Sequence, residues 1–258
     1  TRSADLRQAQ NTSIIKDIRI WIDKINSNPI KELKEILVEL NLETKSIGVE
    51  YEAYGLTGKN AIALNKELDS FAKLKDESFL ITKHRLVKSN QEIQYIKKAA
   101  ELGDEALKKI WELAHPGAHE SDILAAMQGA IFSGGGDYPG NEFIIGSGPN
   151  ALLCRYFSGR RKLDQIDQLT LEFAGVYRHY HSALMRTIPI GKAKKEHFEL
   201  YDICLDALTS CEKKLNIGNT DGEVFENPFA VDPFKWIRNL ARDFEESVNP
   251  DEFLENVK

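Results

Sequence analysis

Cysteine is scarce in this chain of 258 residues, which contains only Cys154, Cys204 and Cys211. The number is odd and the spacing is wide, whereas disulfide frameworks and zinc sites use even sets or closely spaced pairs. The sequence therefore predicts neither kind of site. A reducing, cytoplasmic setting is the simplest interpretation of such cysteine usage.

Long apolar runs and long basic runs are also missing. No apolar stretch approaches the roughly 20 residues of a membrane span, and no signal-peptide pattern opens the sequence. The formal net charge of -6 argues against nucleic acid and anionic membranes as partners. What remains is 42% hydrophobic and 29% charged, an ordinary globular composition. The length suits one large domain or two modest ones, and because the chain starts at Thr1 we expect residues missing before it.

Residues 1–86 have the pattern of the end of an α/β domain. Apolar residues at helical spacing predict a helix over Pro29–Leu42, and residues 56–68 also favour a helix. Short apolar runs at 47–49 and 79–81 predict buried strands. We place the end of this domain at about residue 86.

Residues 87–226 form the second predicted segment. Ser89 and Glu92 make a capping box ahead of a long amphipathic helix that ends before Pro116. The other expected elements are a helix over 120–132, a glycine loop at 134–136, strands at 143–145, 169–173 and 177–185, and a helix over 199–215.

One stretch of this segment carries a resemblance. Leu171–Thr187 reads Leu-Glu-Phe-Ala-Gly-Val-Tyr-Arg-His-Tyr-His-Ser-Ala-Leu-Met-Arg-Thr. It resembles the metal-binding hairpin of the creatinase/aminopeptidase P ("pita-bread") family, in which two aspartates eleven positions apart bridge two divalent ions. Here the first position is Glu172 and the second is Ala183. A methyl group cannot ligate a hard cation, so the resemblance implies a retained scaffold without metal or other cofactor.

The resemblance extends over about residues 47–226 and also rests on the Val-Lys-Ser-x-x-Glu-Ile-x-x-Ile-x-x-Ala-Ala pattern that starts at Val87. It implies the first half of a pita-bread domain, preceded by the end of a creatinase-type N-terminal domain. Residues 227–258 do not match the family and favour two small helices. We therefore expect a chain truncated relative to the family after about residue 226.

The resemblance also supplies candidate site residues. The segment Asp137–Gly148, the run Arg155–Lys162 and the hairpin most resemble the ectoine hydrolase branch of the family. The positions that hold a catalytic Glu and His in creatinase are here Met185 and Arg155, so creatinase activity is not expected. The candidates are Glu172, His181 and Glu142 for catalysis, and Arg155, His179 and Arg186 for substrate binding.

The chemistry of these side chains suits a small zwitterionic substrate. A carboxylate can pair with a cationic amidinium, arginine with a substrate carboxylate, and histidine can move protons near neutral pH. Strand alternation puts His179, His181, Ala183 and Met185 on one face, provided that no bulge intervenes. His-x-His is also a metal-ligand spacing, and Arg186 could equally hold the hairpin together. The run Arg160–Lys162 is expected to be a solvated turn.

The leading hypothesis is a metal-independent hydrolase that opens a cyclic amidine, converting ectoine to N-acetyl-diaminobutyrate. One alternative is an Xaa-Pro aminopeptidase-like metallopeptidase, and another is an inactive pita-bread module that binds peptides. The resemblance implies a homodimer when the protein is intact.

Overall fold

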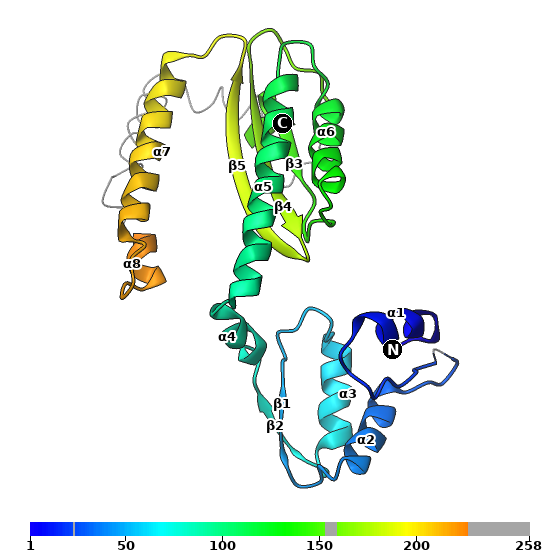
Figure 1. Cartoon of the computed structure of the whole chain (residues 1–258). Helices are drawn as coiled ribbons and strands as arrows, with labels where there is room; N and C mark the ends of the chain where they lie inside the picture. The colour runs from blue at the N-terminus through cyan, green and yellow to red at the C-terminus, as the bar shows by residue number, and fades with distance from the viewer. Residues whose placement is uncertain (23, 153–158, 227–258) are drawn as a thin grey trace, which may run out of the picture. The chain divides into compact units, whose positions relative to one another are not determined.

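The computed structural model describes residues 1–22, 24–152 and 159–226, and it divides after Ser89 into two compact units (Figure 1). Each unit has its own apolar core. The sequence-based boundary at residue 86 lies within the last helix before this division. Both units mix helices with strands, as the fold class predicted from the sequence requires.

The first unit, Thr1–Ser89, is built on a parallel β-α-β crossover. Strand β1 (Ser46–Val49) pairs with β2 (Lys73–Asp76), and α3 (Gly58–Leu68) connects them. Its core consists of Leu64, Leu68, Phe71 and Ala72. The other elements are a 3-10 turn (Ser3–Asp5), α1 (Leu6–Thr12), α2 (Pro29–Glu39) and α4 (Leu80–Leu86).

Two of these helices begin where the sequence provides caps. The Asn28 side chain accepts hydrogen bonds from two backbone N–H groups at the start of α2, and Pro29 follows at the first helical position. Thr57 accepts from Asn60 N–H at the start of α3. The strand expected at residues 79–81 is wrong, because Leu80 and Ile81 begin α4. The strand lies instead at β2, whose Lys-Leu-Lys-Asp sequence buries only Leu74 in part and so gives a weak apolar signal.

The second unit, from Asn90 onward, places two helices against an antiparallel sheet. The sheet has the order β3 (Ile144–Ser147), β4 (Asp167–Tyr177) and β5 (Tyr180–Ile190). Helices α5 (Asn90–Leu113) and α6 (Glu120–Ser133) pack on one face, around a core that includes Leu102, Ile123, Leu171 and Phe173. A 3-10 turn (Gly148–Leu152) follows β3, and α7 (Lys195–Lys214) and α8 (Asp221–Glu226) follow β5.

The hairpin turn lies later than the sequence indicates. We expected strands at 169–173 and 177–185, but β4 continues to Tyr177, and Arg178 and His179 form a two-residue turn with φ of 51° and 64°. Such turns usually use Asn-Gly, so Arg-His gave no turn signal. The register is continuous from Asp167–Ile190 to Tyr177–Tyr180, without a bulge.

The two-residue period of a strand then decides which side chains face the helices. Leu169, Leu171 and Phe173 of β4 enter the core below α5 and α6. The alternate residues face the other way, and Met185 of β5 is 63% exposed there. We call this side of the sheet, opposite α5 and α6, the open face.

Candidate active site

The open face carries both positions at which the sequence predicted a former metal site. Glu172 lies directly opposite Met185 on β5 and Ile144 on β3. Ala183 lies directly opposite Ala174. Residues paired in this way share a face, so Glu172 and Ala183 stand on the same side of the sheet as diagonal neighbours.

Glu172 is half-buried in the middle of β4. Within the described part of the chain its carboxylate makes no hydrogen bond and no ion pair. A carboxylate has roughly four acceptor positions to fill. In the described part of the chain, no side chain or backbone group fills those of Glu172.

A divalent cation does not fit these residues. Met185 stands opposite Glu172, with the Ala174–Ala183 pair on one side and the Thr170–Thr187 pair on the other, and a hard cation needs several oxygen ligands, carboxylates foremost. Among the residues that the structure describes, no group of three His, Cys, Asp or Glu side chains could hold a metal ion. Among the described residues paired in this part of the sheet, Glu172 supplies the one carboxylate of the open face.

His181 stands on the same face but is held by backbone groups. Its Nε2 accepts a hydrogen bond from Gly140 N–H at 2.9 Å, and its Nδ1 lies 3.0 Å from the carbonyl oxygen of His179. This pair of contacts requires the neutral ring with its proton on Nδ1. Both nitrogens are then engaged, so the geometry gives His181 the role of fastening the 137–140 loop to the hairpin.

His179 lies in the turn, not in the strand. The expectation that it shares a strand face with His181 is wrong, because its φ of 64° belongs to the two-residue turn. The His179 N–H donates to Asp137 Oδ2 at 3.1 Å, and Asp137 N–H donates to the carbonyl of Val176 at 3.1 Å. These bonds tie the 137–140 loop to the turn a second time.

The remaining candidates do not converge on Glu172. Arg186 lies opposite Leu171, so strand alternation places it on the helix side of the sheet, and its guanidinium donates to the carbonyl of Met185 at 2.7 Å. Glu142 is exposed in the loop before β3. His181 is opposite Val176, four residues from Glu172, or roughly 13 Å along the strand. Arg155, like Cys154, lies outside the described residues.

A buried polar network on the helix side escaped the sequence analysis. Glu120, fully buried at the start of α6, accepts from Ser147 Oγ at 2.6 Å and from the N–H groups of Arg160 and Arg161 at 3.0 Å each. The Arg161 guanidinium donates to Ser147 Oγ at 2.7 Å and forms an ion pair with Asp167. The expected solvated turn is therefore wrong for Arg161, which joins β3, β4 and α6.

The ionisation of Asp167 follows from this network. Burial alone raises the pKa of a carboxyl group, but hydrogen bonds from Arg161 and from the N–H groups of Asp164 and Gln168 outweigh it. The pKa of Asp167 therefore lies below its ordinary value. The hydrogen bond to Asp167 in turn raises the pKa of Arg161. Two weak signals of this cluster are present in the sequence. Glu120 is the first residue of α6, and Asp167 is the first residue of β4.

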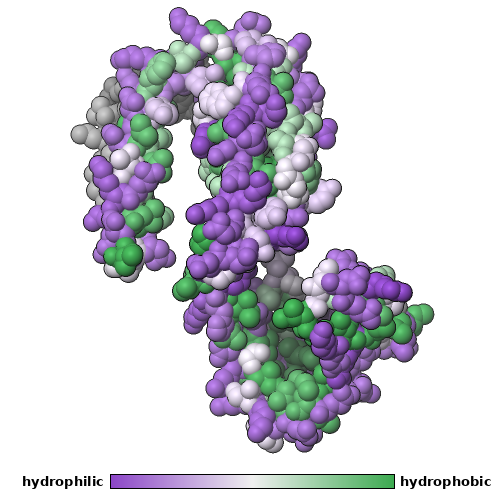
Figure 2. Space-filling view, in the orientation of Figure 1, coloured by the Kyte–Doolittle hydropathy of each residue, from purple (hydrophilic) through white to green (hydrophobic). Residues whose placement is uncertain are grey.

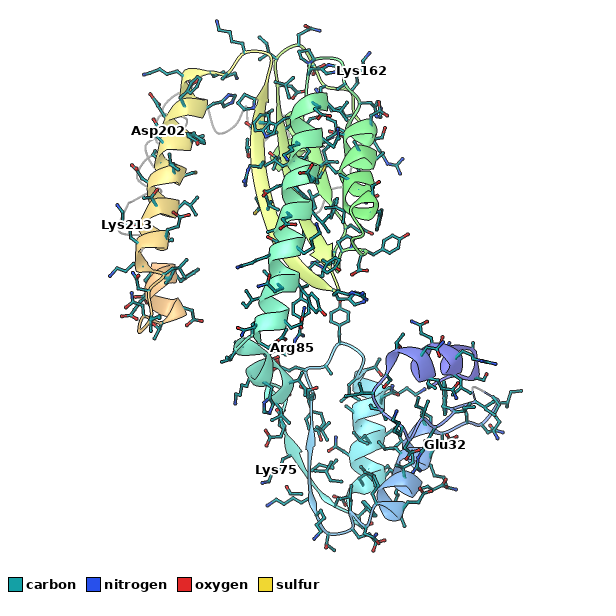
Figure 3. The ribbon with its side chains drawn as sticks, viewed as in Figure 1. Glu32, Lys75, Arg85, Lys162, Asp202 and Lys213 are labelled. Atoms are coloured by element: carbon teal, nitrogen blue, oxygen red, sulfur yellow. The ribbon has the colours of Figure 1, made fainter. Side chains whose placement is uncertain are left out.

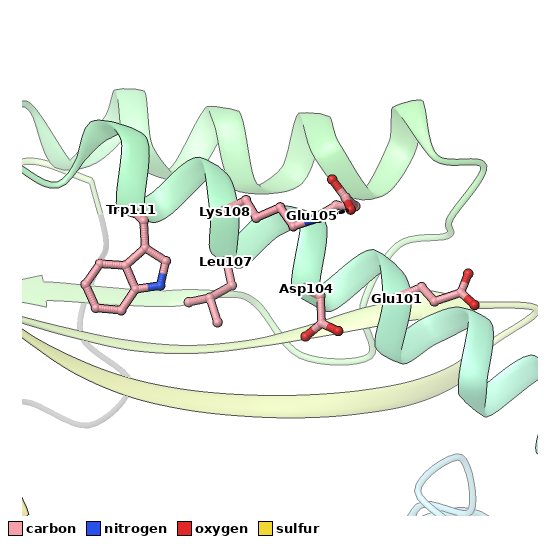
Figure 4. Close-up of a pocket in the computed structure, with 6 residues that line it drawn as sticks. All are labelled: Glu101, Asp104, Glu105, Leu107, Lys108 and Trp111. Atoms are coloured by element: carbon pink, nitrogen blue, oxygen red, sulfur yellow. Dashed lines mark hydrogen bonds and ion pairs between the residues drawn. The ribbon is translucent and has the colours of Figure 1, made fainter.

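A hollow on α5 offers a different surface (Figure 4). It is lined by Glu101, Asp104, Glu105, Leu107, Lys108 and Trp111. Lys108 is the one cationic side chain among these lining residues, and it already forms an ordinary helix ion pair with Glu105 at 2.6 Å. All of the lining comes from one helix, and none of it belongs to the open face.

The comparisons with known proteins agree with this architecture. The Xaa-Pro dipeptidase of Pyrococcus furiosus is 25% identical over 198 residues, which cover 76% of this chain and 56% of that protein. The Xaa-Pro dipeptidase of Pyrococcus horikoshii is 27% identical over 181 residues, which cover 70% and 50%. The chain thus spans about half the length of these curated relatives.

Solved structures are similar in fold. The prolidase from Pyrococcus horikoshii gives a TM-score of 0.72 at 24% identity, over 89% of this chain and 62% of that one. The recombinant prolidase from Thermococcus sibiricus gives a TM-score of 0.73 at 21% identity, over 87% of this chain and 60% of that one.

No helix in the described ranges is long and apolar enough to cross a membrane. The model of metallopeptidase family M24 matches residues 94–228, more than half of the sequence, and the chain belongs to this family, whose fold is the pita-bread fold expected from the hairpin.

Proposed function

We propose that the protein containing this chain hydrolyses a C–N bond in a small zwitterionic substrate, and that Glu172 is the catalytic carboxylate on this half of the site. The observation that carries the proposal is the carboxylate of Glu172 on the open face, which has no hydrogen-bond or ion-pair partner among the described residues. Membership of family M24 supports C–N hydrolysis. The named Xaa-Pro dipeptidases support a peptide-like substrate.

The proposed role of Glu172 is that of a general base. Its carboxylate takes a proton from water while the water oxygen bonds to the carbonyl or amidinium carbon. The C–N bond then breaks, and the departing nitrogen receives the proton from the Glu172 carboxyl. One water molecule is consumed, and each atom and charge is accounted for without a metal ion, which the described residues of the open face do not fit.

Two substrate classes fit this chemistry. An Xaa-Pro dipeptide is favoured by the relatives, and we place it first. A cyclic amidine such as ectoine is favoured by Ala183, because an amidinium pairs with a single carboxylate and does not require the second one that a bridged metal pair needs. The substrate carboxylate would be met by Arg155 in either case, which stays a prediction.

The test uses the intact protein with Xaa-Pro dipeptides and with ectoine, each assayed with and without Mn²⁺. Glu172→Gln keeps the shape of the side chain but cannot accept a proton. We expect it to lower kcat by about 10²- to 10⁴-fold, the usual contribution of a general base. Glu35→Gln, which changes an exposed glutamate of the first unit, is the matched control and should leave kcat unchanged.

Wild-type turnover by Glu172→Gln on both substrates would contradict the assignment of Glu172 as the general base.

A second candidate function is an inactive module that binds peptides. It is favoured by the engagement of both His181 nitrogens, which leaves that ring no free position for proton transfer. Binding of Xaa-Pro dipeptides without turnover of either substrate would support this candidate instead.

A further inference from the structure

Two threonines stand beside Glu172 on the open face. Thr170 precedes Glu172 by two residues on β4, and Thr187 lies directly opposite Thr170 on β5. Residues two apart on a strand share a face, so both side chains lie on the side of the sheet that Glu172 occupies. Thr170 is half-buried and Thr187 is exposed. Within the described part of the chain neither hydroxyl makes a hydrogen bond, although each can donate one and accept two.

The 3-10 turn Gly148–Leu152 covers the sheet beside Thr170. Gly146 of β3 lies directly opposite Thr170 and is buried, although it belongs to the open face. A Cβ atom built on Gly146 would lie 2.7 Å from the carbonyl oxygen of Asn150 and 3.6 Å from Cα of Ala151. The backbone of the turn therefore rests on the open face at Gly146 and forms a wall next to Thr170. Such a wall keeps bulk water away from one side of the hydroxyl pair, which strengthens the hydrogen bonds made there.

Ordinary sheet spacings place the two hydroxyls and the Glu172 carboxylate around one small group. Directly opposite residues have Cβ atoms about 4.5–5.5 Å apart, so both hydroxyls can reach the same atom of a ligand. Successive residues on one face are about 6.6 Å apart along a strand, which leaves room for a water molecule and a carbonyl group between Thr170 and Glu172. The pair on the other side of Glu172, Ala174 and Ala183, has no hydrogen-bonding side chain. Among the described side chains that flank Glu172 on this face, donors therefore lie on the Thr170 side alone.

We propose that Thr170 and Thr187 donate hydrogen bonds to the carbonyl oxygen of the substrate and stabilise the negative charge that this oxygen gains during hydrolysis. This inference rests on the function proposed for Glu172. As Glu172 takes a proton from water, the water oxygen bonds to the carbonyl carbon, and the π electrons of the carbonyl group move onto its oxygen. The two hydroxyls hold this oxyanion without transferring a proton, and the carbonyl group forms again when the C–N bond breaks. Donors that are in place where charge develops are among the largest contributions to catalysis.

Other donors near the start of β4 lie elsewhere. Arg161 is engaged on the helix side of the sheet. Lys162, labelled in Figure 3, lies near the α5–α6 connection, where a Cβ atom on Gly117 would be 3.8 Å from its Cε atom. Gln168 shares the open face but is four residues from Glu172, or roughly 13 Å along the strand.

The arrangement also gives the substrate a direction. Helices α5 and α6 cover the helix side of the sheet, and Figure 2 shows the mostly hydrophilic surface that α5 turns to solvent. A substrate therefore approaches Glu172 from the open face. Its carbonyl oxygen points toward the 3-10 turn, and its apolar part lies over the alanine pair.

The experiment compares Thr170→Val and Thr187→Val with Thr170→Ser and Thr187→Ser in the intact protein, assayed with an Xaa-Pro dipeptide. Valine has the shape of threonine and suits a strand, but it lacks the hydroxyl. We expect each valine variant to lower kcat by about 10²- to 10³-fold, the usual loss for one oxyanion donor. KM should change less than about threefold, because the lost bond belongs to the transition state. Each serine variant keeps a hydroxyl and should retain kcat within about tenfold. Thr82→Val, which changes an exposed threonine of α4, is the control and should leave kcat unchanged.

A second measurement needs no turnover. Calorimetry follows the binding of a phosphinic analogue of the dipeptide, in which a tetrahedral phosphorus with charged oxygens replaces the attacked carbonyl group. The valine variants should bind this probe at least about tenfold more weakly than the wild type. Glu172→Gln should bind it at least as tightly as the wild type, because the amide does not repel the negative probe. Urea unfolding checks that each variant keeps its stability.

The outcomes separate this inference from the role of Glu172. Valine variants with wild-type turnover and probe binding, beside an inactive Glu172→Gln, would overturn the hydroxyl pair alone. Equal losses in the valine and serine variants would also overturn it, since the hydroxyls would then not be responsible. Full turnover by Glu172→Gln with weak probe binding by the valine variants would contradict the role of Glu172 and support the hydroxyl pair. A wild-type protein that neither hydrolyses the dipeptide nor binds the probe would overturn both.

Discussion

Position 175 shows at the scale of a single residue how closely helix α5 approaches the hairpin. A Cβ atom built on Gly175 would lie 1.8 Å from the carbonyl oxygen of Ala99 and 2.5 Å from the nitrogen of Gly103. Both of these are backbone atoms of α5, so no side-chain rotation can relieve the clash. A glycine at this position allows the strand and the helix to touch through their backbones.

We therefore predict that Gly175→Ala destabilises the second unit by about 3 kcal/mol or more, at the upper end of the cost of overpacking. Gly129→Ala in α6 is the control, since a Cβ there meets nothing within 4 Å. That change should stabilise by about 0.5–1 kcal/mol, because alanine is the better helix former. Urea unfolding measures both variants, and equal stabilities would contradict the backbone contact.

The second residue-scale prediction concerns Asp167. Its pKa is lower in the folded protein than in the unfolded chain, so its ionisation stabilises the fold above the ordinary carboxyl pKa of about 3.9. This contribution is lost as the pH falls below about 4 and through the folded pKa. Asp167→Ala should destabilise the fold by about 1.5–3 kcal/mol at neutral pH, because it removes the buried acceptor of Arg161 and leaves that guanidinium with the exposed Asp164 and the Ser147 hydroxyl.

Unfolding free energies of the wild type and Asp167→Ala, measured between pH 3 and pH 7, check this prediction. The difference should be constant above about pH 5 and should shrink towards low pH. A difference that stays the same down to pH 3 would mean that the Arg161 pair does not stabilise the ionised carboxylate.

At the scale of elements, the sequence predicts those helices that carry strong periodicity or caps. The ranges expected for α2, α3 and α6 agree with the structure to within three residues at each end. Strand β2 was not predicted, because Lys73 and Lys75 alternate with residues that are at most half-buried. The position of the hairpin turn was not predicted, because Arg178 and His179 are not residues that usually form two-residue turns.

The sequence predicted only those features of the site that follow from the pairing of β4 with β5. Because the register is unbroken, Glu172 and Ala183 share the face that the sequence assigned to them. The bonds of His181 to Gly140 and of Arg161 to Asp167 join loops to strands through tertiary packing. No periodicity or spacing encodes such contacts, so the roles of these two residues could not be derived.

The open face also permits a prediction about metal affinity. Dialysed wild-type protein should carry Mn, Co and Zn well below one ion per chain, because the described residues place no second carboxylate, His or Cys ligand beside Glu172. Ala183→Asp adds a carboxylate at a diagonal position, with Cβ atoms about 7 Å apart, which two side chains can bridge around one ion. Calorimetry should then detect weak Mn²⁺ binding in this variant and none in the control Ala183→Asn. Stoichiometric metal in the wild-type protein would contradict the prediction.

At the scale of the whole molecule, the two units differ in how much apolar surface they bury. The first unit has a core of four buried residues, whereas the core of the second unit has fourteen, counted over the described part of the chain. Hydrophobic burial is the main favourable term in folding, so the first unit should be much the less stable.

We therefore predict two unfolding transitions, of which the lower belongs to the first unit. Leu68→Ala should lower only the first transition, by more than about 10 °C, since a buried leucine contributes roughly 2–5 kcal/mol and the unit has 89 residues. Leu102→Ala should lower only the second transition, because Leu102 belongs to the other core. Differential scanning calorimetry of the wild type and both variants measures the transitions. A single transition that both substitutions shift equally would mean that the two cores unfold as one cooperative unit.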